Sequence, residues 1–210
     1  MIASPLVRLL ARLGAAEAPP SAPPFADRLG QWVGWTDAIS LSAALEGGMP
    51  QSASRASPDH DAPEIREAAE CARIRSACGK ALAAPVDAAS VDFLPQRRHI
   101  GTRQHAMEQA VAPLRARLRS KLAAASPAMA RLAAVDVVME QVLAPHESRL
   151  LATVPLVLQK HFERLRKSAP GDEPPRWLDG FGRDMREVLM AELDLRFQPI
   201  DGLLEALRMR

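Results

Sequence analysis

The sequence predicts an all-α protein: an irregular multi-helix bundle with a long kinked helical segment and a small N-terminal helical unit. Apolar residues make up 48% of the 210 residues, but only 4% are aromatic and tyrosine is absent. The apolar residues are mostly Ala, Leu and Val, whereas β-sheets favour aromatic and β-branched side chains. Apolar residues also recur at spacings of three and four, which is typical of amphipathic helices. These observations argue against an all-β fold.

The first helix is predicted at the N-terminus of the chain. Ser4 and Pro5 provide a cap and a first turn, and Gly14 closes the segment. Between them an apolar stripe runs from Leu6 to Leu13 at helical spacing. Arg8 and Arg12 interrupt the stripe, so we expect a structural helix rather than the apolar core of a secretory signal; an Arg-containing organellar presequence is the alternative that the composition leaves open.

Two more short helices complete the expected N-terminal unit, residues 1–46. A proline-rich connector covers 18–24, and a second helix begins near Phe25 and ends at Gly34. The third helix is expected over 38–46, with Thr36 and Asp37 as caps. Four large side chains are expected to anchor the unit: Phe25, Trp32, Trp35 and Ile39.

The rest of the chain is predicted to be a flexible linker, 47–62, followed by one helical bundle domain, 63–210. The linker is rich in Gly, Ser, Pro and Asp and has almost nothing to bury. Helical stripes with caps and prolines at their ends predict the helices of the bundle. Outside the central segment, these helices are expected over 63–84, 97–124, 182–197 and 200–209.

Residues 126–168 give the strongest structural signal. The segment contains no glycine, and its apolar residues follow one another mainly by three and four, as in a coiled-coil hairpin or helical bundle. Pro145 and Pro155 lie inside the pattern, and each removes an amide donor and crowds the preceding turn. The segment is therefore expected to kink or split at these prolines.

Known chemical motifs are missing from the sequence. There is no Gly-x-Ser-x-Gly nucleophile elbow, and Gly180-Phe181-Gly182 lacks the third glycine and the preceding strand of a phosphate loop. The five histidines form no His-Glu-x-x-His or Glu-x-x-His pair. We therefore expect no catalytic, cofactor-binding or metal-binding residues, and the protein is predicted not to be an enzyme.

A cluster of basic residues lies between residues 97 and 121, although the net charge of the chain is only +2. Its surface could bind the phosphates of nucleic acid or of anionic lipid. Alternatively, the cations could pair with Glu64, Glu67 and Glu70 of the preceding helix and leave a mixed, solvated surface. The candidate anion-binding residues are Arg97, Arg98, Arg103, Arg115, Arg117, Arg119 and Lys121.

The apolar stripes suggest another kind of site, at which a helix of a partner protein docks. The candidate surfaces are the central segment, 126–168, and the unit around Trp32 and Trp35. The candidate docking residues are Trp32, Trp35, Val135, Met139, Val142, Leu150, Val154 and Val157.

The expected location is the cytoplasm, with no transmembrane segment. Cys71 and Cys78 are too few for a disulfide framework, and the apolar stretches are shorter than a membrane span.

The chain resembles an uncharacterised family of bacterial proteins, more narrowly proteobacterial ones, that is defined as a domain of unknown function. The segments that carry the resemblance are 6–13, 25–29, 31–45 and 197–207. The resemblance covers essentially the whole chain and implies a cytoplasmic protein with no catalytic residues to carry over. The leading functional hypothesis is a non-enzymatic adaptor or assembly protein that acts through helix-face contacts with a protein partner or a second copy of itself. The alternative is a nucleic-acid or anionic-lipid binder that uses the basic helix, 97–121.

Overall fold

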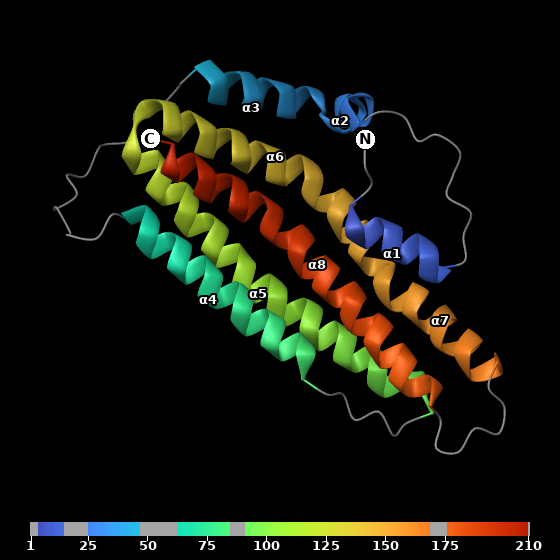
Figure 1. The fold of residues 1–210 in the computed structure, drawn as a ribbon. Coiled ribbons are helices and arrows are strands. Elements are labelled where there is room, and N and C mark those ends of the chain that lie inside the picture. The colour runs from blue at the N-terminus through green and yellow to red at the C-terminus, as the bar shows by residue number, and fades with distance from the viewer. Residues whose placement is uncertain (1–3, 15–24, 47–62, 85–90, 169–175, 210) are drawn as a thin grey trace. The chain divides into compact units, whose positions relative to one another are not determined.

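The computed structural model consists almost entirely of helices (Figure 1). It describes residues 4–14, 25–46, 63–84, 91–168 and 176–209. No strand occurs within these ranges, so the all-α prediction is confirmed. The expected linker, 47–62, and the proline-rich connector, 18–24, lie outside the described residues.

Eight helices lie in the described ranges. In chain order they are α1 (Pro5–Gly14), α2 (Phe25–Trp32), α3 (Trp35–Glu46), α4 (Pro63–Ala83), α5 (Phe93–Ala125), α6 (Pro127–Ala152), α7 (Val154–Ser168) and α8 (Trp177–Arg208). Three helices, α3, α5 and α8, begin earlier than predicted. Capping hydrogen bonds account for the early start of α3 and α5. The carboxylate of Asp37 accepts the N–H of Gly34 at 3.0 Å, and that of Asp92 accepts the N–H of Leu94 at 3.3 Å.

The long central segment splits at one of its two prolines. Thr153 lies in a turn between α6 and α7, two residues before Pro155. At Pro145, by contrast, α6 continues without a break. The expected kinked segment is therefore present, as two successive helices.

The C-terminal part is one helix where two were predicted. Pro199 was expected to interrupt it, but α8 continues to Arg208. A proline inside a helix costs about 3 kcal/mol, and full burial of one large apolar side chain recovers about 1.5 to 3 kcal/mol. Burial beyond the proline outweighs its cost, because four side chains there are buried: Ile200, Leu203, Leu204 and Leu207. Gly180 and Gly182 lie inside the same helix.

The chain divides into two compact units, each described by itself. Unit 1 comprises Met1–Ser21, Arg75–Ala110 and Arg149–Arg196, and unit 2 comprises Ala22–Ile74, Val111–Ser148 and Phe197–Arg210. This division does not follow the expected boundary at residue 46. Helix α1 belongs to unit 1, whereas α2 and α3 belong to unit 2.

In unit 1, α1 packs on α7 (Figure 1). A group of aromatic rings lies in the core of this unit. The apolar stripe of α1 is buried, as its spacing predicted. Phe162 of α7 lies at the centre of the rings, with centroids 5.5 Å from Phe93, 5.0 Å from Phe181 and 4.9 Å from Trp177. Four of the eight aromatic residues of the chain thus lie together where α5, α7 and α8 meet.

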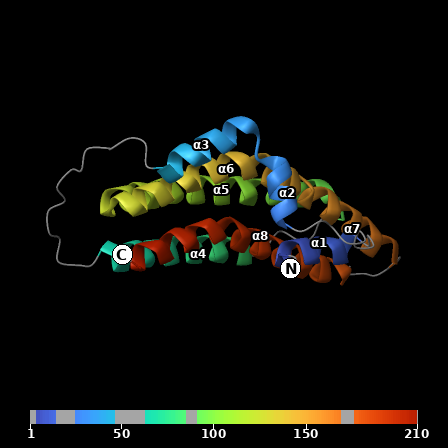
Figure 2. The ribbon, with the colours of Figure 1, turned by 90° about the horizontal axis from the view of Figure 1, so that it is seen from above.

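In unit 2, the core is mainly aliphatic, with Phe197 as a buried aromatic residue. Leu114, Leu118 and Leu122 are buried at four-residue spacing on α5, and Val138 and Val142 are buried on α6. Helix α3 lies beside α6 in both views (Figures 1 and 2). No side chain of α3 is buried, whereas α4, α5, α6 and α8 each contribute buried side chains to this unit.

Candidate functional site

Helix α3 presents large apolar side chains to solvent. Trp35 is 82% exposed, Ile39 54% and Leu45 60%. At 100° per residue these three side chains fall within an arc of about 120° on one side of the helix. Single exposed apolar residues are normal on protein surfaces, but three on one side of a 12-residue helix form a patch. We call Trp35, Ile39 and Leu45 the α3 face.

Contacts of the preceding helix hold α3 in place. Trp32 of α2 stacks on His146 of α6, with ring centroids 3.9 Å apart and planes 20° from parallel. The guanidinium of Arg28 lies 4.8 Å from the centroid of the Trp32 ring, a cation–π contact. Two residues separate α2 from α3. The carboxylate of Asp37, in the first turn of α3, accepts the N–H of Gly34, which directly precedes the helix. The α3 face therefore belongs to an ordered helix anchored on α6.

The predicted docking residues are mostly occupied within the chain. Val142 and Val154 are buried, and the others except Trp35 are half-buried. In unit 1, Val157 lies 3.9 Å from the position of a Cβ at Gly14, so α1 covers this part of α7. Among the eight candidates, Trp35 is the one that is exposed. Trp35 and Ile39, which were expected to anchor the N-terminal unit, point to solvent instead, so that expectation is wrong.

The middle of the basic segment pairs with acidic residues of the next helix. Arg115 and Arg119 of α5 both bind the carboxylate of Asp136 on α6, with closest distances of 2.7 and 2.6 Å. Both also reach Glu140, at 3.2 and 2.7 Å. The two arginines and the two acids are each four residues apart, so the pairs match turn for turn. These cations contribute to the packing of α5 on α6.

The ionisation of Asp136 follows from this network. Burial alone would raise the pKa of its carboxyl group, but the hydrogen bonds and charges of Arg115 and Arg119 outweigh burial, so the pKa lies below its ordinary value. A carboxylate with a lowered pKa stabilises the fold fully above its unfolded-state pKa, and this contribution disappears as pH falls through the folded-state pKa.

We therefore expect an acid-dependent loss of stability that Asp136→Asn reduces. Urea unfolding of the wild type, followed between about pH 5 and 2, should show a falling free energy of unfolding. The variant should be less stable at neutral pH but lose less on acidification. Asp194→Asn, at an exposed position on α8, is the control and should keep the wild-type slope. If the free energy of unfolding fell equally with pH in all three proteins, the ion pairs of Asp136 would not be the source of the acid-dependent loss.

The remaining basic residues are more dispersed. Arg117 binds Glu67 at 3.0 Å and reaches Glu70 at 3.7 Å, both on α4. This pairing is the one that the mixed-surface interpretation predicted. Arg97, Arg98 and Lys121 are exposed, and Arg103 is half-buried. The phosphate-binding interpretation thus loses three of its seven candidate cations to internal ion pairs.

Comparison with known proteins places the chain in a family. Residues 1–209 match the family described as "Protein of unknown function (DUF3348)". The chain belongs to the DUF3348 family. The full-length resemblance expected from the sequence is thereby confirmed. No curated protein and no solved structure matches the chain.

A buried polar cluster lies at the helix break of this DUF3348 chain, within unit 1. Pro155 has no N–H to donate to the carbonyl of Leu151 four residues earlier, and the side-chain amide of Gln104 donates to that carbonyl at 3.2 Å. The same amide nitrogen donates to Glu192 at 2.9 Å. Arg196 completes the cluster by binding the other carboxylate oxygen of Glu192 at 2.8 Å. Gln104 thus supplies to the Leu151 carbonyl the hydrogen bond that Pro155 cannot donate.

A second polar cluster lies around His161, also in unit 1. Its Nε2 is 2.6 Å from Asp184, and its Nδ1 is 2.8 Å from the guanidinium of Arg164. A catalytic histidine needs one ring nitrogen to face the substrate. Both nitrogens of His161 are engaged and the side chain is buried, so neither nitrogen faces a substrate site in this arrangement.

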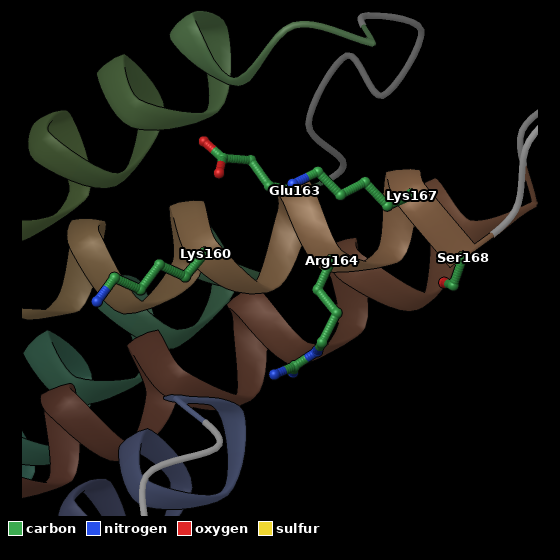
Figure 3. A pocket seen from close by; sticks show the side chains of 5 residues that line it. All are labelled: Lys160, Glu163, Arg164, Lys167 and Ser168. Carbon is green, nitrogen blue, oxygen red and sulfur yellow. The ribbon is translucent and has the colours of Figure 1, made fainter.

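A shallow hollow of about 500 Å³ lies on α7 of the DUF3348 chain. The residues that line it are Lys160, Glu163, Arg164, Lys167 and Ser168. Glu163 and Arg164 point in opposite directions, and Arg164 reaches towards α1 (Figure 3). The charged groups therefore do not converge on one point, as a site for a small ligand would require.

Other chemically reactive residues do not assemble in the part of the chain that the structure describes. It contains no group of three or more His, Cys, Asp or Glu side chains that could hold a metal. Burial raises the pKa of the thiols of Cys71 and Cys78, which keeps both in the less reactive protonated form. Among the described helices, none is long and apolar enough to cross a membrane.

Sequence reasoning missed parts of these sites that had a readable signal. Leu45 was not singled out, although α3 carries apolar residues on nearly all sides, a pattern typical of a helix buried or covered by a partner. Asp136 and Glu140 were not matched with Arg115 and Arg119, although both pairs share a four-residue spacing. Arg28 was not matched with Trp32, although the two residues are four apart on the predicted second helix.

Proposed function

We propose that this DUF3348 protein is a non-enzymatic helical adaptor whose α3 face docks onto an apolar helix face of a partner protein. The observation that carries the proposal is the exposure of Trp35, Ile39 and Leu45 on a helix with no buried side chain. An exposed tryptophan next to aliphatic side chains is typical of interaction hot spots. The anchoring of α2 on α6 supports the proposal because a preordered face loses less conformational entropy on binding.

The chemistry of α3 favours a helix as the partner. The helix has 12 residues, which corresponds to about 18 Å, and its exposed side combines large apolar residues with serine and alanine. Large residues next to small ones provide the ridges and grooves by which two helices pack. Helix α3 contains no arginine or lysine, so its exposed side has no cation that would attract the phosphate groups of a nucleic acid or lipid.

Site-specific crosslinking followed by a binding assay tests the proposal. A photoreactive residue at position 35 should crosslink a partner, whereas the same residue at Ser40, exposed on another side of α3, should not. The captured protein is then purified and titrated against the wild type. We expect Trp35→Ala to weaken its binding by at least about 2 kcal/mol, or about 30-fold in Kd.

The matched control for binding is Leu156→Ala, which removes an exposed apolar side chain from α7. It should bind like the wild type. Equal affinity of the Trp35→Ala variant would overturn the proposal. Sedimentation analysis that finds a homodimer dissolved by the Trp35 substitution would also overturn it, since the partner would then be a second copy.

No structural observation favours the alternative, a nucleic-acid or anionic-lipid surface binder. Three of its seven cations are ion-paired, and Arg115 and Arg119 lie close to two carboxylates each. We therefore retain the adaptor hypothesis alone.

A further inference from the structure

The hydrogen bonds of His161 fix its protonation state. A guanidinium can only donate hydrogen bonds, so the Nδ1 that lies 2.8 Å from Arg164 must be an acceptor without a proton. The ring proton is then on Nε2, which donates to the carboxylate of Asp184 at 2.6 Å. In this arrangement His161 is neutral and bridges an anion on α8 and a cation on its own helix.

Arg164 also links this histidine to α1. The same nitrogen of its guanidinium donates to the carbonyl oxygen of Leu13 at 3.1 Å, in the last turn of α1. That carbonyl has no partner within its own helix, because the last turn of any helix leaves carbonyls free. Figure 3 shows Arg164 extending from α7 towards α1. Arg164 is thus a tether that caps α1 and is aligned by His161.

We propose that protonation of His161 releases this tether and loosens the C-terminal end of α1 from α7. A proton on Nδ1 converts the acceptor into a donor and places a second positive charge against the guanidinium. Arg164 is exposed and can turn towards water, whereas His161 stays bound to Asp184 through Nε2. When Arg164 turns away, the carbonyl of Leu13 loses its cap, and α1 is then held by the burial of its leucines and by the exposed pair of Arg12 and Glu187.

The other charged groups near this contact do not replace the tether. Among the described residues of α1, α7 and α8, Asp184 is the carboxylate that binds His161. Arg12 of α1 binds Glu187 of α8 at 2.9 Å, with both side chains about half exposed, and such surface pairs add little. Glu163 of α7 accepts a hydrogen bond from Gln159.

Hydrogen exchange of the full chain, measured by mass spectrometry on the α1 segment, tests the inference. In a series of decreasing pH, protection of α1 relative to a peptide from α8 should fall about tenfold after correction for the intrinsic rate, as expected for the loss of one hydrogen bond. Arg164→Ala should show the lower protection at both ends of the series. Arg166→Ala, an exposed cation two residues away, is the control and should behave like the wild type.

His161→Asn separates titration from packing. Its amide oxygen takes the place of Nδ1 as an acceptor for Arg164 but does not titrate, so protection of α1 should no longer depend on pH. Nitrogen NMR of the wild-type imidazole should show the Nε2–H tautomer at the upper end of the series. A pH dependence that persists in His161→Asn, or an Nδ1–H tautomer, would overturn the inference.

Discussion

Replacing Arg196 with alanine is expected to lower the free energy of unfolding by about 3 to 5 kcal/mol. The guanidinium donates to one carboxylate oxygen of Glu192 through two nitrogens, at 2.8 and 3.0 Å. Glu192 is 0% exposed, so the variant leaves a carboxylate in the core with only Gln104 as a donor. An unpaired buried charge costs much more than the loss of one hydrogen bond. Urea unfolding followed by circular dichroism measures the change.

Arg208→Ala is the matched control for this prediction. Arg208 lies on the same helix and binds Glu205 at 3.3 Å, but both side chains are more than half exposed. Exposed pairs contribute less than about 1 kcal/mol. Replacing both Glu192 and Arg196 with methionine should recover much of the loss, because no charge is then buried. Equal destabilisation by Arg196→Ala and Arg208→Ala would refute the assigned role of Glu192.

Local signals in the sequence predicted helix positions well. Ser4 with Pro5 and Ser126 with Pro127 each begin a helix, and Pro155 lies where α6 gives way to α7. Caps and prolines act through the backbone of the nearest turns, so their effect can be read from a short window. Pro199 shows the limit of such signals. Its local cost is outweighed by the burial of Leu203 and Leu207, which depends on the whole fold.

It was harder to predict which side of each helix packs inside the protein and which side is exposed. Trp35 and Ile39 were expected to anchor a separate N-terminal unit, yet both are largely exposed. Apolar spacing identifies a stripe but does not say which other stripe it packs against. The division of the first 46 residues between two units has the same cause, since α1 finds its apolar partner on α7.

The candidate sites depended on contacts between distant residues. The sequence suggested that the basic residues could pair with Glu67 and Glu70, and Arg117 does so. The network of Arg115 with Asp136, and the link from Arg164 to Leu13, join residues 21 and 151 positions apart. Spacing alone cannot select such pairs among the many charged residues of the chain. The pairs can be identified only when the burial of each side chain and the distances between them in the folded protein are known.

Phe162→Ala should also destabilise the protein by about 3 to 5 kcal/mol, because it empties the centre of the aromatic core of unit 1. The Phe162 ring is 1% exposed and contacts Phe93, Phe181 and Trp177. The remaining rings can close the cavity only by shifting, which would disturb the edge-on contact between Phe93 and Phe181. Urea unfolding measures the loss, and near-ultraviolet circular dichroism reports the packing of Trp177. Leu156→Ala, on the exposed side of α7, should change stability by less than about 0.5 kcal/mol. If the two variants were equally stable, Phe162 would not hold this core together, and α7 would have to be secured by its contacts with α1 instead.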